Sequence, residues 1–88
     1  MLNARDSIEA EIVRLVQGAG GDAPALSLTT DLVGLGLTSL MFAELLIGME
    51  MELGVDPFQG ETSIVEMRTV GDLVTAYDDA LAAASARA

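Results

Sequence analysis

The chain has no cysteine, no histidine and no tryptophan, and only four of its 88 residues are basic. Without cysteine it has neither a disulfide framework nor a thiolate ligand, and without histidine it has no imidazole to bind a metal or act as a base. These absences exclude a zinc site and a serine–histidine catalytic arrangement. Aromatic residues make up only 3% of the chain. The core therefore has to be built from aliphatic side chains, Met and Ala, which suit packed helices.

Acidic residues dominate the charge, because fourteen Asp and Glu stand against four Lys and Arg and give a formal net charge of −10. A field of this sign repels phosphate backbones and anionic membrane surfaces. It also speeds encounter with proteins that present Arg and Lys. We therefore expect partner proteins with basic surfaces, and neither nucleic acid nor a membrane as a partner.

Long apolar runs are also missing. No stretch approaches the roughly 18 uninterrupted apolar residues of a membrane span, and the charge-interrupted start lacks the apolar segment of a secretory signal. We expect a soluble, cytoplasmic monomer without enzymatic activity of its own. Residues 1–88 show no repeat or linker and are expected to form one domain, with an Ala-rich tail at 79–88 that frays. So small a domain buries only about 60% of the surface that its unfolded chain exposes, which leaves little room for an active-site cleft.

The first half of the sequence predicts one helix and a long loop. Asp6 or Ser7 is the candidate cap of the first helix, and the glycine-rich stretch 18–24 ends it. Its apolar stripe consists of Ile8, Ile12, Leu15 and Val16. Residues 25–37 have no clean periodicity and are predicted to form a loop. A few apolar side chains should pin that loop to the core, among them Leu28, Leu32 and Leu35.

The second half predicts a helix at 39–53, a short helix near 63–67 and a last helix from a capping box of Thr69 and Asp72. The core-facing residues of 39–53 are Phe42, Leu45, Leu46, Met49 and Leu53. Its opposite side should carry Met41, Glu44, Gly48 and Met51. The last helix repeats Leu73, Val74, Tyr77 and Leu81 at helical spacing. The result is an all-α domain.

The order of these motifs resembles a known family. The pattern runs "DLVGLGLTSLMFAELLIGMEMELGV", then "RTVGDLV" and a last helix. It resembles the phosphopantetheine-dependent carrier proteins, which comprise acyl carrier protein and the peptidyl and aminoacyl carrier domains. The resemblance covers nearly the whole chain. It implies an antiparallel four-helix bundle with three main helices and one short helix.

The resemblance implies that Ser39 receives a 4′-phosphopantetheine arm from a phosphopantetheinyl transferase. The terminal thiol of the arm would hold an acyl or aminoacyl group as a thioester and present it to ligases, transferases and synthases. Ser39 opens a predicted helix, where unpaired N–H groups and the helix dipole favour a phosphodiester. The alternative interpretation makes Ser39 a simple N-cap, although the adjacent Thr38 can also cap.

The resemblance further implies that enzymes recognise one face of the second helix. The candidate recognition residues are Thr38, Leu40, Met41, Glu44, Ile47, Glu50, Met51 and Met67. Exposed Met suits a surface that repacks against several partners. For Glu50 and Glu52, ordinary solvent-facing charge is as good an interpretation as a role in recognition. In the family Val65 and Met67 lie near the arm, but core packing is the simpler interpretation for both.

Two departures from the family bear on its function. Thr38 stands where the family most often has Asp, so an acidic contact used by many transferases is missing. The stretch 55–68 looks longer than in the compact fatty-acid type and contains Pro57 and Gly60, which favours a dedicated route such as polyketide, nonribosomal peptide or aminoacyl transfer. The alternative hypothesis is an unmodified acidic adaptor that binds a basic partner through its second helix. No Asp-rich loop of the EF-hand type is present.

Overall fold

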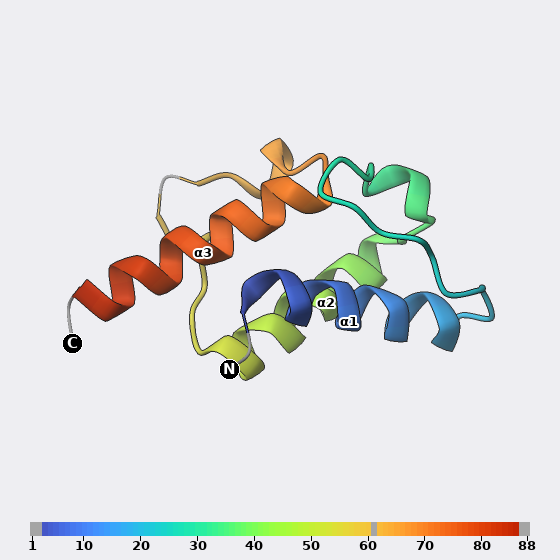
Figure 1. The fold of residues 1–88 in the computed structure, drawn as a ribbon, viewed down its shortest axis with the longest axis horizontal. Helices are drawn as coiled ribbons and strands as arrows, with labels where there is room; N and C mark the ends of the chain where they lie inside the picture. Colours follow the sequence, from blue (N-terminus) through green and yellow to red (C-terminus); the bar gives the residue numbers. More distant parts are fainter. Residues whose placement is uncertain (1–2, 61, 87–88) are drawn as a thin grey trace.

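The computed structural model describes residues 3–60 and 62–86. Its elements are α1 (Ala4–Gly18), the 3₁₀ turn η1 (Val33–Leu35), α2 (Ser39–Leu53), the 3₁₀ turn η2 (Ile64–Glu66) and α3 (Val70–Ala86). Helix α1 packs against both α2 and α3 and runs in the opposite direction to them (Figure 1). The all-α bundle is confirmed, with its short helix reduced to η2, while η1 was not predicted. No helix among the described residues is long and apolar enough to cross a membrane.

The start of α1 differs from the prediction. The side chain of Asn3 accepts a hydrogen bond from the amide of Asp6 at 2.8 Å, so Asn3 is the cap and neither Asp6 nor Ser7 is. Ser7 is buried instead, with 2% of its surface exposed. Its hydroxyl donates to Oε1 of Glu52 at 3.1 Å. Because a buried hydroxyl needs a partner, this bond ties the start of α1 to the end of α2.

The core is mainly aliphatic, as the composition predicted, with Tyr77 as its one fully buried aromatic side chain among the described residues, and it draws on all three α-helices. Of the five core positions predicted on α2, Leu45 and Met49 are fully buried and the other three are partly buried against the core. The loop before η1 contributes one buried side chain, that of Leu32. Leu28 was expected to pin the loop in the same way, but its side chain is 42% exposed. Leu28 acts through its backbone.

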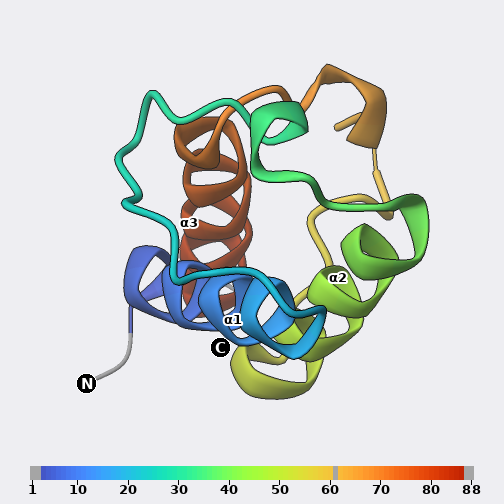
Figure 2. The same ribbon diagram turned by 90° about the vertical axis from the view of Figure 1, so that its right-hand side faces the viewer.

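That backbone contact belongs to a latch, which we define as the three hydrogen bonds between residues 28–32 and residues 68–71. The bonds run from Leu32 N to Arg68 O at 2.9 Å, from Val70 N to Thr30 O at 3.0 Å, and from Gly71 N to Leu28 O at 2.8 Å. Figure 2 shows the loop before η1 passing beside the start of α3. The latch therefore fixes the segment that leads into α2 against the first turn of α3.

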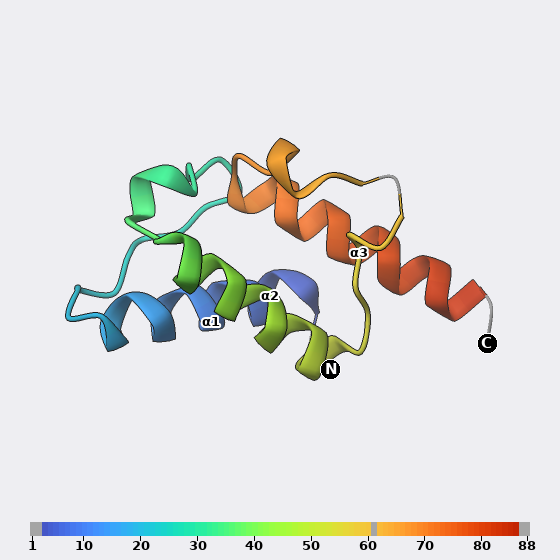
Figure 3. The same ribbon diagram turned by 180° about the vertical axis from the view of Figure 1, so that it is seen from behind.

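The capping box at the start of α3 is confirmed. The amide of Asp72 donates to Oγ1 of Thr69, and Oδ2 of Asp72 accepts from the amides of Thr69 and Arg68. The bonds from the Arg68 and Thr69 amides lower the pKa of the Asp72 carboxyl. Helix α3 extends beyond the other helices towards the C-terminus and includes residues 79–86 (Figure 3). The fraying of this tail stays a prediction, and 87–88 lie outside the described residues.

The single tyrosine is expected to make stability depend on alkaline pH. Tyr77 is 1% exposed and meets the ring of Phe58 edge-on, with centroids 6.2 Å apart. Burial first, and the negative charges of Asp56 and Glu50 second, raise its pKa from 10.0 to about 12. The neutral phenol therefore makes its full contribution to the free energy of unfolding below pH 10. Up to about 3 kcal/mol of that contribution is lost as the pH rises through the pKa of the folded state.

Tyrosinate absorbance and circular dichroism, recorded together during an alkaline titration, check this expectation. The phenol should ionise above pH 10, near or together with helix loss, and Tyr77→Phe should remove that part of the pH dependence. Ionisation near pH 10 in a chain that keeps its helices would contradict it.

Salt is expected to raise the melting temperature. The described residues form two ion pairs, Arg5 with Glu9 at 3.3 Å and Arg14 with Glu11 at 2.8 Å, both within α1. Most of the fourteen carboxylates therefore have no cationic partner in the described structure, and their mutual repulsion opposes compaction. Added salt screens this repulsion. Thermal unfolding at low and at moderate NaCl tests the point, and a melting temperature that stays flat or falls would contradict it.

Candidate functional site

Ser39 is the first residue of α2 and is exposed to solvent. The hydroxyl of the preceding residue, Thr38, accepts the hydrogen bond from the amide of Met41 at 3.1 Å. Thr38 is therefore the cap of α2, and the interpretation of Ser39 as the cap is wrong. The Ser39 hydroxyl makes no hydrogen bond with any residue that the structure describes. The fold leaves this hydroxyl available for chemistry.

The electrostatic environment of Ser39 favours an anion. The first turn of α2 contains no acidic residue, whereas the first turns of α1 and α3 contain Asp6 and Asp72. The amides of Ser39 and Leu40 have no partner among the described residues. Unpaired N–H groups and the positive end of the helix dipole stabilise an anion by roughly 0.3 to 1 kcal/mol. In a chain with fourteen carboxylates, this acid-free helix start is where a phosphate group fits.

A cavity of about 180 Å³ lies beside Ser39. Its lining residues are Leu32, Val33, Leu37, Thr38, Ser39, Phe42 and Met67. The turn that leads into it is shaped by Gly36, whose φ of 75° lies in the region that glycine tolerates best, and by Asp31, whose side chain accepts from the amide of Val33. The sequence did not identify Val33 as a site residue, yet Val33 lines this cavity and is 84% exposed. The only signal for it was an apolar residue set close to Asp and Gly in a loop.

The outer face of α2 is apolar and acidic. We use the name outer face for Leu40, Glu44, Ile47 and Met51, which recur at helical spacing on the side opposite the core. The exposed fractions of Leu40, Ile47 and Met51 are 70%, 59% and 83%. Glu44 is exposed between them. The structure thus brings together four of the residues that the sequence suggested for recognition, although it shows no partner.

Two residues assigned to that outer side lie elsewhere. Met41 is half-buried and packs against the core. Gly48 lies against α1, because a Cβ placed on it would come within 2.9 Å of Oε2 of Glu11. Each residue of a helix turns about 100° from the last, so Met41, Gly48 and Glu52 share a flank that faces α1. The sequence could not place this flank because it does not give the direction from which α1 approaches.

The remaining residues considered from the sequence are Glu50, Glu52, Met67 and Val65. Glu50 is exposed, and Glu52 accepts the bond from Ser7 described above. Met67 is half-buried, packs against the core and also lines the cavity beside Ser39. Val65 is 83% exposed, so its interpretation as a core residue is wrong. Val65 lies in the turn η2, none of whose residues is buried.

A covalent phosphate ester fits this site better than a metal ion does. The described residues contain no group of three or more His, Cys, Asp or Glu that could hold a metal. They do provide an unpaired exposed hydroxyl, two unpaired amides at an acid-free helix start and a small, largely apolar cavity. These features suit a phosphodiester followed by a flexible organic chain.

The chain belongs to the family described as phosphopantetheine attachment site, whose characteristic sequence matches residues 10–77. Proteins of this family carry covalently attached 4′-phosphopantetheine. Among solved structures, the chain is similar to the solution structure of MacpD, an acyl carrier protein from Pseudomonas fluorescens involved in mupirocin biosynthesis. The identity is 34% and the TM-score 0.74, over 83% of this chain and 66% of that chain. No curated protein matches the sequence with significance.

Proposed function

We propose that the chain is a carrier that bears 4′-phosphopantetheine on Ser39. It carries an acyl or aminoacyl group, presents it to partner enzymes of a specialised cytoplasmic biosynthetic route, and catalyses no reaction itself. The observation that carries this proposal is the exposed hydroxyl of Ser39, which the fold does not use because Thr38 caps the helix. The similarity to MacpD, which is involved in mupirocin biosynthesis, supports the specialised route.

The residues around Ser39 would bind and orient the attached group. The group supplies a thiol that this cysteine-free chain lacks, and that thiol can hold an acyl group as an activated thioester. The unpaired amides at the start of α2 stabilise the phosphate. The apolar wall of Phe42 and Met67 limits the directions in which the attached chain can leave Ser39. The described residues that line this cavity include no general base, and the partner enzyme would deprotonate the Ser39 hydroxyl during attachment.

Intact-protein mass spectrometry tests the attachment. The chain is incubated with coenzyme A, Mg²⁺ and a broad-specificity phosphopantetheinyl transferase, beside Ser39→Ala and a matched control, Ser63→Ala. Ser63 directly precedes η2, and its side chain makes no capping hydrogen bond. We expect one phosphopantetheinyl group on the native chain and on Ser63→Ala, and none on Ser39→Ala.

The absence of a mass gain with several transferases would contradict the carrier proposal. It would favour the alternative, an unmodified acidic adaptor that binds a basic partner through the outer face of α2. The exposed Leu40, Ile47 and Met51 would then be the surface to use as bait.

Partner enzymes are proposed to dock on the outer face of α2 through basic surfaces, with the carrier as a monomer. Glu44→Lys should lower kcat/KM of the transferase about tenfold at low salt, because charge pairs at an interface mainly set the association rate. Asp78→Lys is the matched control, since it changes the net charge equally at an exposed site on α3. Equal losses in the two variants would show that only net charge matters and would contradict docking at this face.

A further inference from the structure

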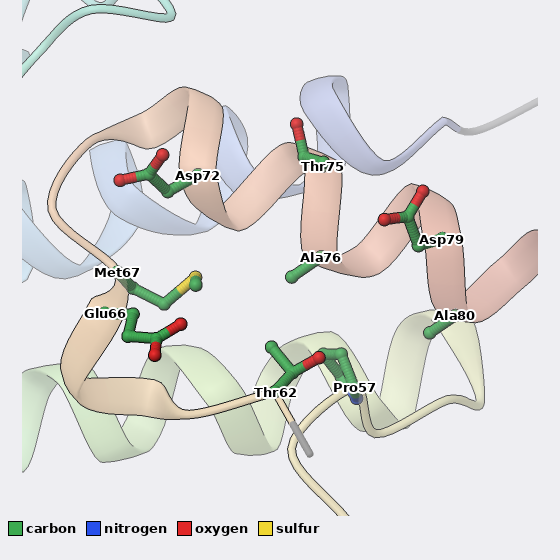
Figure 4. A pocket seen from close by; sticks show the side chains of 9 residues that line it. All are labelled: Pro57, Thr62, Glu66, Met67, Asp72, Thr75, Ala76, Asp79 and Ala80. Carbon is green, nitrogen blue, oxygen red and sulfur yellow. The ribbon is translucent and has the colours of Figure 1, made fainter. Parts of the chain in front are cut away.

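A second and larger cavity shares one lining residue, Met67, with the cavity beside Ser39. It is a cleft of about 490 Å³ between α3 and the described residues, 57–60 and 62–67, of the segment before it. The lining residues are Pro57, Thr62, Glu66, Met67, Asp72, Thr75, Ala76, Asp79 and Ala80. Figure 4 shows the residues of the segment facing those of α3 across an open space. No residue of α2 lines this cleft.

Met67 connects the cleft to the site at Ser39. It lines both the small cavity beside Ser39 and the large cleft, and no other residue does. Its side chain is a thioether with three rotatable bonds, which adapts its shape at low cost. A flexible chain that leaves Ser39 along the wall formed by Met67 is thereby directed towards the cleft.

The chemistry of the cleft favours a short group with a positive end. Ala76 and Ala80 give α3 a small apolar surface, and Thr62 supplies a hydroxyl. Glu66 and Asp79 are exposed carboxylates that have no ion pair with a described residue. The third carboxylate, that of Asp72, is occupied by the amides of Arg68 and Thr69.

None of the described residues that line the cleft is basic, and the whole chain carries a formal net charge of −10. Opposite charges a few ångströms apart attract and like charges repel, even when partly screened. The cleft therefore attracts an ammonium group and repels a carboxylate.

We propose that this cleft receives the acyl group carried on Ser39 and selects one that bears an ammonium group, an aminoacyl group, over neutral or carboxylated groups of the same length. This inference rests on the proposed function, because it needs the covalent arm at Ser39. It adds the class of the carried group, which neither the family nor the similar carrier specifies. Met67, which lines both cavities, lies between Ser39 and the cleft on the path of the arm.

Three loaded forms of the protein test this selection. The transferase attaches arms that end in β-alanyl, butyryl or succinyl groups through a stable amide, so that only the terminal group differs: ammonium, methyl or carboxylate. Mass spectrometry first verifies one arm on each chain. Two-dimensional NMR then records the amide shifts of Thr75, Ala76 and Ala80 and nuclear Overhauser contacts between the carried group and the methyl groups of Ala76 and Ala80.

We expect contacts to Ala76 and Ala80 for the β-alanyl form, weaker ones for the butyryl form and none for the succinyl form. The variant Glu66→Gln/Asp79→Asn should reduce the β-alanyl contacts to the butyryl level. The matched control is Asp22→Asn/Asp78→Asn, which removes two exposed carboxylates outside the cleft. It should leave the difference between the β-alanyl and butyryl forms intact.

The outcomes separate this inference from the proposed function. If no arm attaches, both fall together. If arms attach but all three forms match the unacylated holo protein at the cleft, only this inference falls. Equal contacts for the β-alanyl and butyryl forms, or a loss of selection in the Asp22→Asn/Asp78→Asn control as large as in the cleft variant, would also overturn it.

Discussion

Leu45→Ala is expected to lower the free energy of unfolding by about 2 to 5 kcal/mol. Leu45 is fully buried in α2 between the other core side chains, so truncation removes apolar contacts and leaves a cavity that a small bundle fills only in part. Domains have total stabilities of only about 5 to 15 kcal/mol. We therefore expect the variant to lose a large share of its stability and to unfold at a lower urea concentration, which urea titration followed by circular dichroism would measure.

Ile47→Ala is the matched control on the same helix. Ile47 is two residues further on and 59% exposed, so its truncation should change the free energy of unfolding by no more than about 0.5 kcal/mol. It removes apolar area from the outer face instead and should slow the transferase. A stability loss in Ile47→Ala equal to that in Leu45→Ala would show that the outer face is not free surface.

Gly71→Ala is expected to break the latch. A Cβ at this position would lie 2.7 Å from the carbonyl oxygen of Leu28, the same oxygen that accepts the bond from the Gly71 amide. That oxygen belongs to the backbone, so the loop has to move as a whole. Forced overpacking typically costs about 1 to 3 kcal/mol, although alanine is the better helix former.

Gly60→Ala is the control for Gly71→Ala, because a Cβ at Gly60 meets nothing within 4 Å. Its unfolding midpoint in urea should stay within experimental error of the native one. In Gly71→Ala the amides of Leu32 and Val70 should also lose protection from hydrogen exchange, since their bonds belong to the latch. A variant with native stability and native protection would mean that the latch contributes nothing.

Local patterns predicted those features whose physics is local. The bounds of the helix at 39–53 follow from the cap before it and the glycine after it, and the structure has the same bounds. The capping box of Thr69 and Asp72 is a signal within four residues and is confirmed. At the site, the sequence drew attention to Ser39 and to the outer face of α2, and the structure places both on the surface.

The sequence predictions were wrong where contact with a segment distant in the sequence determines whether a residue is buried or exposed. Ser7 looked like a cap, but it is buried by the end of α2 and bonded to Glu52. Gly48 looked outward because nothing in the sequence tells where Glu11 of α1 comes to lie. Val65 looked like core because apolar character alone does not reveal that a single 3₁₀ turn leaves it exposed.

The cleft beyond Met67 was not foreseen for the same reason. Its two walls come from segment 57–67 and from α3, and only the packing of the folded chain sets their separation. The residues that define its charge, Glu66 and Asp79, are unremarkable in the sequence. They are two among fourteen carboxylates.

The latch also sets an order of events during synthesis of the protein. Its two sides lie far apart in the sequence, and the bond from Gly71 to Leu28 cannot form until residue 71 has left the ribosome. Closing so long a loop has an entropy cost that precedes any gain from the bonds. The segment that leads into Ser39 is therefore fixed only after the start of α3 has been made. A chain that stops before α3 would therefore lack the three hydrogen bonds that hold residues 28–32, which lead towards Ser39.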